Sequence, residues 1–268
     1  MLKFFDQKIR RAFSDAAAQY DALTSLHREI GRELIRKIET RNPAPAILDV
    51  GMGTGWFTSK LVHSFPGAQV AGVDSAGGMV DAARRREEPL TIVQADARAL
   101  PFRPDSFDVV TSNLAYQWVE ELPPALGDLL RVLRAGGHLC LTMFGYHTLA
   151  ELFESLEASV NAAGKEKNIL GRRLADAEAV EAALQRAGFA EISVVAERIT
   201  VHFPDLLGLV KWTRDIGANH LAGDLFVGKE LLSRAGEYYD RRYRDGFGIR
   251  ATFEVFWVSA RKPRMERP

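Results

Sequence analysis

The sequence predicts an α/β fold built on a doubly wound, mostly parallel sheet. Short apolar runs alternate with amphipathic helical segments between residues 46 and 144, and a glycine-rich turn follows the first apolar run. No stretch approaches the ~18 apolar residues of a membrane helix. The 268 residues are 47% hydrophobic and 26% charged, which is typical of a folded globular chain. We expect a single domain over residues 1–268.

Each element follows from its apolar spacing. Residues 1–42 carry helical spacing from about 7 to 38 and predict one or two helices, which the prolines at 43 and 45 end. The core, 46–144, predicts strands at 46–50, 69–73, 90–94, 107–111 and 138–144, with helices at 55–65, 76–86 and 122–133. Residues 145–250 predict helices at 148–163, 175–187, 206–220 and 229–242, and a sixth strand at 192–203. A last strand is expected within 251–262, and the helices before it are expected to form a lid.

Charge and cysteine content exclude several classes of function. Lys plus Arg and Asp plus Glu both number 35, so no overall positive charge is available to hold nucleic acid. Cys140 is the single cysteine, which excludes an intrachain disulfide and an all-thiolate zinc site. The six histidines are scattered along the sequence, so no metal site is predicted. The first eleven residues lack an apolar signal core, and we expect a cytoplasmic protein with no membrane partner.

The most informative stretch is the loop Asp49-Val-Gly-Met-Gly-Thr-Gly55, between a predicted strand and a predicted helix. Glycines there permit a tight turn and a close approach of ligand to backbone. A dinucleotide fold needs a third glycine where this chain has Trp56, so that ligand is excluded. Asp74 ends the second strand, where it can accept from ribose hydroxyls, and Asp96 ends the third, where it can meet an adenine amino group. Taken singly, each piece is explained equally well by a turn or a helix cap.

Five segments in order resemble the class I S-adenosylmethionine-dependent methyltransferases. They are Asp49–Gly55, Gly72-Val-Asp74-Ser, Gln94-Ala-Asp96-Ala, Phe107-Asp-Val-Val and Arg131-Val-Leu-Arg-Ala-Gly-Gly137. The resemblance implies a Rossmann-like sheet of seven strands, the last antiparallel, and S-adenosylmethionine as cofactor. It also implies a cofactor site made of Asp49, Gly51, Gly53, Gly55, Asp74, Ser75, Met79, Asp96, Ala97 and Asn113.

The methyl acceptor must be argued separately, because the core does not define it. The segment Asn113-Leu-Ala-Tyr116 lacks the paired prolines typical of enzymes that methylate the amino groups of bases. Cys140 lies within a predicted strand, so we interpret it as a core residue and not as a nucleophile. Both observations disfavour nucleic acid as the substrate.

Further segments resemble the malonyl-acyl carrier protein O-methyltransferases of biotin biosynthesis. They include Ala12–Asp21, Asn113–Val119, Leu141–Gly145, Lys211–His220 and Ala251–Trp257. Ala135 and His27 depart from that family, in which proline and glutamine are usual. The resemblance implies methyl transfer to the free carboxylate of a malonyl thioester on acyl carrier protein.

The substrate carboxylate has a pKa near that of Asp, about 3.9, so it is already ionised at neutral pH and no general base is predicted. Candidate substrate-binding residues are Tyr20, Gln117, Trp118, Lys211, Arg214, Asn219 and His220. Lys211 and Arg214 share a helix face, which is equally well explained as a solvated surface. Tyr20 and Trp118 can instead be packing residues, and Asn219 with His220 can be a helix cap.

The carrier protein is expected to be acidic, and arginine clusters can steer it. The clusters are Lys8-Ile-Arg-Arg11, Arg84-Arg-Arg86, Arg172-Arg173 and Arg241-Arg242, of which the last two are preferred; each can also be a solubilising run.

Two other functions remain open. One is a small-molecule O- or C-methyltransferase, in which His147 or His220 acts as base. The other is a methyltransferase-fold assembly factor for respiratory complex I.

Overall fold

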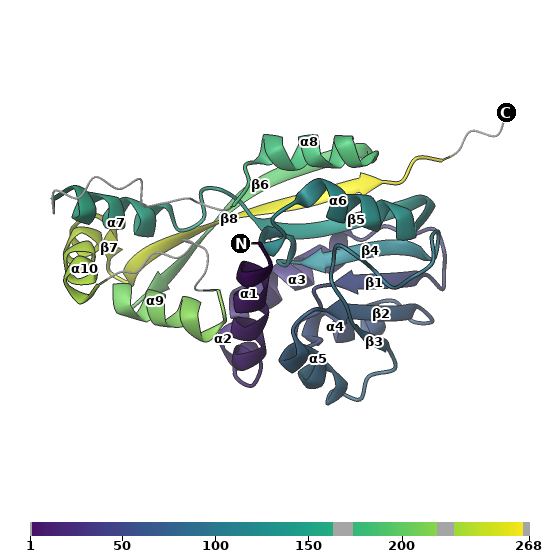
Figure 1. The fold of residues 1–268 in the computed structure, drawn as a ribbon, viewed down its shortest axis with the longest axis horizontal. Coiled ribbons are helices and arrows are strands. Elements are labelled where there is room, and N and C mark those ends of the chain that lie inside the picture. The colour runs from purple at the N-terminus through teal and green to yellow at the C-terminus, as the bar shows by residue number, and fades with distance from the viewer. Residues whose placement is uncertain (1, 163–173, 219–227, 265–268) are drawn as a thin grey trace.

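A computed structural model describes residues 2–162, 174–218 and 228–264. Figure 1 shows a mixed sheet with helices on both faces and a group of helices gathered at one end of two long strands. The chain begins with α1 (Leu2–Ala16), α2 (Tyr20–Leu23) and α3 (Ser25–Lys37). The prediction of an α/β, doubly wound sheet is confirmed.

In the first half of the sheet, strands alternate with helices except between β3 and β4. Its elements are β1 (Ala46–Val50), α4 (Trp56–Ser64), β2 (Gln69–Asp74), α5 (Gly77–Arg84), β3 (Thr91–Gln94), β4 (Phe107–Asn113), the short 3-10 helix η1 (Tyr116–Trp118), α6 (Leu122–Val132) and β5 (Leu133–Phe144). The second half comprises α7 (Ala150–Ala162), α8 (Ala177–Ala187), β6 (Ala190–Phe203), α9 (Leu206–Asp215), α10 (Lys229–Tyr243), β7 (Arg244–Asp245) and β8 (Gly248–Arg261).

The strand order is β3-β2-β1-β4-β5-β8-β6. The first five strands are parallel, and β8 lies antiparallel between β5 and β6. The expected antiparallel last strand is therefore present. β7 has two residues, too few for an alternating pattern to show in the sequence. It pairs with the start of β8 and brings the described sheet to eight strands.

Three boundaries differ from the sequence prediction. The N-terminal segment forms three helices, because a turn follows Ala16 and the Thr24 hydroxyl donates to the carbonyl of Tyr20 at 2.7 Å. β5 begins at Leu133, opposite Phe107, where a helix end was expected. α9 ends at Asp215 because Gly217 takes φ +79° and its N–H donates to the Arg214 carbonyl at 2.9 Å.

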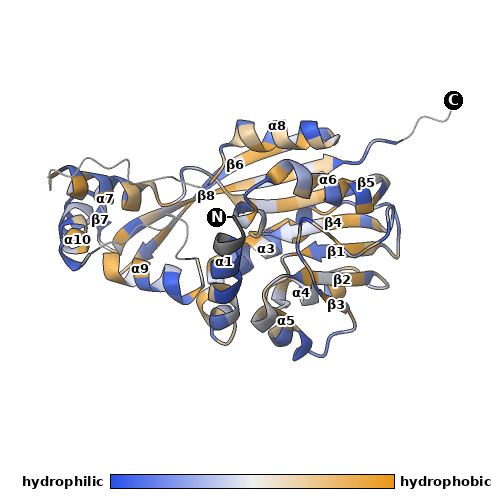
Figure 2. Ribbon diagram, in the orientation of Figure 1, coloured by the Kyte–Doolittle hydropathy of each residue, from blue (hydrophilic) through white to orange (hydrophobic). Residues whose placement is uncertain are grey.

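Two apolar layers cover the sheet. One joins α3 and α4 to the sheet through residues such as Leu34 and Leu61 and continues under α7, α9 and α10. The other packs α6 and α8 against the opposite face through Leu129 and Leu184. Figure 2 shows hydrophobic residues concentrated along the central strands and hydrophilic residues on the outer helix faces. Among the described residues, no helix is long and apolar enough to cross a membrane.

The segment Ala251–Trp257 lies in β8, between β5 and β6. Glu254 is buried there, and its Oε2 accepts from the backbone N–H of His147 at 3.0 Å. Its backbone N–H and carbonyl both bond to the Thr148 hydroxyl at 3.1 Å. These contacts fix the turn between β5 and α7.

Candidate cofactor and acceptor site

A cleft opens at the carboxyl ends of the parallel strands, which is where ligands bind in sheets of this kind. It encloses about 930 Å³ of empty space, its solvent-open mouth included. Eight of the predicted cofactor residues line it: Gly51, Gly53, Asp74, Ser75, Met79, Asp96, Ala97 and Asn113. The remaining two, Asp49 and Gly55, lie outside the lining.

The glycine loop has the backbone that its sequence predicts. Gly51 takes φ +78°, and a Cβ atom added there would lie 2.2 Å from the Cβ of Ala115. Gly53 takes φ +56°, and its N–H donates to Oδ2 of Asp74 at 2.9 Å. The other carboxylate oxygen of Asp74 accepts from the N–H of Ala76 at 2.8 Å. Asp74 thus holds the loop and also faces the cleft.

Asp49 and Gly55 support the loop from outside the cleft. Asp49 is fully buried; its Oδ2 accepts from the Thr58 hydroxyl at 2.6 Å, and its Oδ1 has no partner among the described residues. Burial raises the pKa of Asp49 to about 7. Gly55 takes φ +79°, and a Cβ atom there would lie 3.0 Å from the Cβ of Ala83, so glycine lets α5 pack closely.

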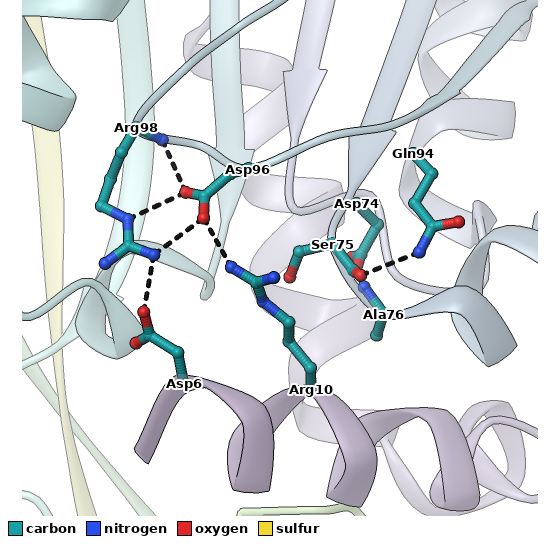
Figure 3. A network of polar contacts seen from close by, with 8 residues as sticks. All are labelled: Asp6, Arg10, Asp74, Ser75, Ala76, Gln94, Asp96 and Arg98. Carbon is teal, nitrogen blue, oxygen red and sulfur yellow. Dashed lines mark hydrogen bonds and ion pairs between the residues drawn. The ribbon is translucent and has the colours of Figure 1, made fainter. Parts of the chain in front are cut away.

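Asp96 is held by two arginines (Figure 3). Its Oδ1 accepts from the backbone N–H and Nε of Arg98, both at 2.9 Å. Its Oδ2 accepts from Arg98 Nη2 at 2.7 Å and from Arg10 Nη2 at 2.5 Å. The hydrogen bonds from Arg98 are the main reason that the pKa of Asp96 falls to about 2. Asp96 therefore stays ionised at neutral pH.

The first helix covers the cleft, which the sequence did not indicate. Asp6, Ile9, Arg10 and Phe13 of α1 all line it. Asp6 also forms a 2.6 Å ion pair with Arg98, so α1 is tied to the end of β3 twice. Arg10 belongs to one of the arginine clusters considered as a contact for the carrier protein, though not one of the preferred two, and it points to the cofactor cleft.

The predicted substrate residues separate into three groups. Tyr20 and Trp118 line the cleft, and Phe13 stacks edge-on against both. Gln117 is buried, and its amide donates to the Leu114 carbonyl at 2.7 Å. Lys211 and Arg214 are exposed on α9, away from the lining, while Asn219 and His220 fall outside the described residues.

The expected lid helix α9 contacts the N-terminal helices instead of the cleft lining. The indole N–H of Trp212 donates to the Leu23 carbonyl at 2.8 Å, and the Gln19 amide donates to the Asp215 carbonyl at 3.2 Å. Arg214 forms a 3.0 Å ion pair with Asp215. Within the described residues, α1 and α2 therefore line the cleft, and α9 contacts the N-terminal helices without lining it.

A second cavity adjoins the cleft. It encloses about 430 Å³, open solvent included, and shares Tyr20, Gly51, Gly53 and Asn113 with the cleft. The cavity is also lined by His27 and Arg28 of α3. No pattern in the sequence indicates Arg28 as a site residue, and His27 stands out there only as a departure from the family that the chain resembles.

The other chemically reactive candidates are accounted for. Cys140 is buried in β5, and burial raises its thiol pKa to about 12, as suits a core residue. Arg86 donates to the Thr54 carbonyl and pairs with Asp21, so it braces the glycine loop. In the described parts of the chain, no group of three or more His, Cys, Asp or Glu side chains is placed to hold a metal ion.

Of the two preferred arginine clusters, one is described. Arg241 is exposed, and Arg242 forms a 3.1 Å ion pair with Glu154 of α7. Arg172 and Arg173 lie outside the described residues.

Comparisons with known proteins agree with this architecture. A family profile described as a methyltransferase domain matches residues 48–141. The chain is also similar to a solved phosphoethanolamine N-methyltransferase 2 of Haemonchus contortus in complex with S-adenosyl-L-methionine. That likeness covers 87% of this chain and 52% of the other, with a TM-score of 0.55 and 22% identity, and it shows the same fold.

Curated relatives match almost the whole chain. A malonyl-[acyl-carrier protein] O-methyltransferase of Methylococcus capsulatus is 34% identical, over 94% of this chain and 92% of the relative. A protein of the same name from Gallionella capsiferriformans is 35% identical, over 95% of this chain and 90% of the relative. The chain therefore belongs to the family of malonyl-[acyl-carrier protein] O-methyltransferases.

Proposed function

We propose that this protein transfers a methyl group from S-adenosylmethionine to the free carboxylate of malonyl-acyl carrier protein. The observation that carries the proposal is similarity over 94% of the chain to a relative of that name. A cleft lined by two aspartates at successive strand ends, next to a second cavity, supports it.

The cleft fits the methyl donor. We assign the carboxylate of Asp74 to the ribose hydroxyls and that of Asp96 to the adenine amino group, since both line the cleft at the ends of successive strands. With those two ends assigned, Gly51 and Gly53 are left to hold the methionine part. Both line the cleft, and because glycine has no side chain, a ligand can approach their backbone closely. Tyr20 and Asn113 border both cavities and would flank the reactive methyl group of a bound donor.

The chemistry requires positioning more than proton transfer. The donor supplies a methyl group on a positively charged sulfur, which becomes a neutral thioether as the S–CH3 bond breaks. One carboxylate oxygen forms the new bond to carbon, and the negative carboxylate becomes a neutral ester without any proton moving. The protein must therefore align the oxygen and exclude water. Tyr20, Phe13 and Trp118 form an aromatic wall suited to that exclusion.

The partner in this reaction is a carrier protein bearing a malonyl thioester. Arg241 and Arg242 at the end of α10 are the described arginine cluster that we favour as its contact. We further propose that the reaction takes place in the cytoplasm, because a chain with one cysteine gains nothing from an oxidising compartment.

Label transfer tests the proposal directly. Protein is incubated with methyl-labelled S-adenosylmethionine and either malonyl- or acetyl-acyl carrier protein, which differ in the free carboxylate. We expect label only in the malonyl sample, released by mild base as methanol. Label in neither sample, with S-adenosylmethionine binding intact by calorimetry, would contradict the proposal and favour a small-molecule acceptor or an assembly role.

A further inference from the structure

Strands β6 and β8 continue as a two-stranded ribbon beyond the end of β5 (Figure 1). β5 ends at Phe144, opposite Val255 of β8, whereas β6 and β8 stay paired as far as Phe203 and Ile249. A strand rises about 3.4 Å per residue, so the ribbon reaches about 20 Å past the end of β5. Because β5 ends at the edge of the sheet that holds the cofactor cleft, the ribbon projects from that same edge.

The two faces of this ribbon differ in how they are covered. On one face, Ile249, Ala251 and Phe253 of β8 are buried in the apolar layer that includes α7, α9 and α10. On the other face, the alternate positions of β6 from Ala196 to His202 are all exposed, and Arg250, opposite His202, is exposed as well. Within the described residues, this second face therefore has no packing partner.

We propose that this open face of the ribbon binds the acidic carrier protein that bears the malonyl thioester. The inference rests on the proposed function and adds the surface on which its partner docks. The open face consists of five side chains, four from the ribbon and one from the hairpin between β7 and β8: Arg198, Thr200, His202, Phe247 and Arg250. The hairpin follows directly after α10, so the open face extends the contact already favoured at the end of that helix.

The charges on the open face suit an acidic partner. Arg198 is exposed, and its guanidinium group has no ion-pair or hydrogen-bond partner among the described residues. Arg250 is half exposed and makes only a long contact of 3.9 Å with Asp245. The Asp245 carboxylate also lies 3.0 Å from Nε2 of His202 and accepts from the N–H of Phe247 at 2.9 Å. Both arginines are therefore left to pair with carboxylates of a partner protein.

Phe247 gives the open face an apolar contact. The residue is 85% exposed at the tip of the hairpin, and its ring centroid lies 5.6 Å from that of His202. Aromatic residues and arginine are enriched where proteins bind one another, and exposed phenylalanine is not expected on a free surface without a role. Phe247 beside Arg250 thus favours a protein as the ligand over a small molecule.

The open face lies on the side of the sheet that α6 and α8 cover. Val194 and Phe256 belong to the same alternation along β6 and β8, and both pack in the apolar layer under those helices. Trp118, which follows β4, lines the cleft just before α6. In the strand order, the end of β5 separates β4 from the ribbon, and Tyr146 and His147 are exposed there. A thioester arm can therefore pass from the open face to the cleft beside Trp118.

The other side of the cleft is closed by α9. Gly217 follows this helix and packs so tightly on α1 that an added Cβ atom would lie 3.0 Å from the Ala12 carbonyl oxygen. Trp212 of α9 also donates to the Leu23 carbonyl at 2.8 Å. An arm that entered from this side would have to part α9 from the N-terminal helices. The packing thus favours a carrier protein bound on the open face.

Two acceptors that share the thioester arm test the docking surface. Malonyl-acyl carrier protein and malonyl-pantetheine carry the same malonyl thioester, but only the first contains a protein. We expect the variant Arg198→Gln/Arg250→Gln to raise the KM for malonyl-acyl carrier protein about fivefold or more, since it removes two exposed ion pairs with the carrier. Its kinetics with malonyl-pantetheine should stay within about twofold of wild type. Phe247→Ala should act in the same direction.

Arg103→Gln is the matched control. Arg103 is also an exposed arginine, but it precedes β4 at the opposite edge of the sheet. Its removal should leave the kinetics with both acceptors unchanged. Unchanged S-adenosylhomocysteine affinity and thermal unfolding show that each variant is folded.

Photo-crosslinking gives a readout that does not depend on methyl transfer. Thr200→p-benzoylphenylalanine places a crosslinker at the centre of the open face, and Arg103→p-benzoylphenylalanine places one away from it. We expect irradiation with malonyl-acyl carrier protein to join the carrier to the first variant and not to the second. The yield should fall when Arg198→Gln and Arg250→Gln are added. A crosslink between two copies of this chain, with none to the carrier, would overturn the proposal and make the open face a contact between subunits.

The outcomes distinguish this proposal from the proposed function. A wild-type KM for malonyl-acyl carrier protein in Arg198→Gln/Arg250→Gln overturns the docking surface and leaves the methyl transfer in place. A carrier that crosslinks at Thr200 but receives no methyl group contradicts the proposed function and leaves the docking surface in place.

Discussion

Arg10 of α1 and Asp96 at the end of β3 form a 2.5 Å ion pair across the mouth of the cofactor cleft, although 86 residues separate them in the sequence. With Arg98 on the same carboxylate, Asp96 already accepts four hydrogen bonds. An adenine amino group that needs this carboxylate must therefore displace one donor. Arg10 is the donor that can leave, because it reaches Asp96 from a separate helix.

Removing Arg10 should tighten cofactor binding. Arg10→Met keeps the aliphatic part that lines the cleft and removes the competing charge. A partly exposed ion pair is worth about 0.5–1 kcal/mol, so we expect a roughly two- to fivefold gain in affinity for S-adenosylmethionine by calorimetry. Arg11→Met is the control, because the Arg11 side chain is 86% exposed and pairs only with Asp15 at 3.8 Å in the described structure. A loss of affinity in Arg10→Met would mean that Arg10 helps hold the bound cofactor.

Removing the carboxylate of Asp74 should weaken cofactor binding. Asp74→Ala loses the acceptor for ribose and also the bond to the Gly53 N–H, whereas Asp74→Asn keeps one acceptor oxygen. We expect about a tenfold or larger loss in affinity for the alanine variant and a smaller one for asparagine. Calorimetry at constant pH measures both. Equal affinity in all three proteins would remove Asp74 from the site.

Gly51 should tolerate no side chain in the present backbone. Gly51→Ala places a Cβ atom 2.2 Å from that of Ala115, at φ +78°. We expect a loss of about 1–3 kcal/mol in the free energy of unfolding and of most cofactor affinity. Adding Ala115→Gly should restore part of the stability, since it relieves the contact and leaves the backbone strain. No rescue in the double variant would show that contact with Ala115 is not the cause.

Asp49 should make the protein less stable as pH rises from 4 to 7. Its pKa of about 7 in the folded state lies above the ordinary value of 3.8, so in that range the folded protein holds a proton that the unfolded chain releases. Asp49→Asn cannot ionise and still accepts from Thr58. Its stability relative to wild type should therefore grow across this range and level off above pH 7, as urea unfolding at each pH would measure. An Asp81→Asn control, at an exposed position, should show no such trend. A difference between Asp49→Asn and wild type that stays constant with pH would contradict the burial effect.

The site residues that the sequence predicts correctly are those whose positions depend on the sheet alone. Asp74 and Asp96 end parallel strands, and the carboxyl ends of such strands meet at one edge, so their proximity follows from topology alone. Gly51 and Gly53 follow from the turn between β1 and α4. None of these positions depends on how distant helices dock.

The remaining site residues depend on how helices pack against the sheet, which the order of residues in the sequence does not show. Arg10 and Arg28 lie on helices that precede the sheet, and only tertiary packing brings them to the strand ends. Lys211 and Arg214 are cations on one helix face, which makes them candidates for a substrate carboxylate. Periodicity does not show which helix face turns to solvent, and in the structure theirs does. A correct helix was thus not enough to place its cations.

Three ion pairs of the described residues tie the N-terminal helices to the core at the rim of the cleft. Asp6 with Arg98, Arg10 with Asp96, and Asp21 with Arg86 pair across that boundary, and each pair is partly exposed. Dissolved ions weaken such contacts, and the screening length shrinks from about 30 Å at 0.01 M to about 3 Å at 1 M salt. Ionic strength should therefore set how firmly α1 is held over the cleft, and cofactor affinities measured in different buffers would describe different degrees of closure.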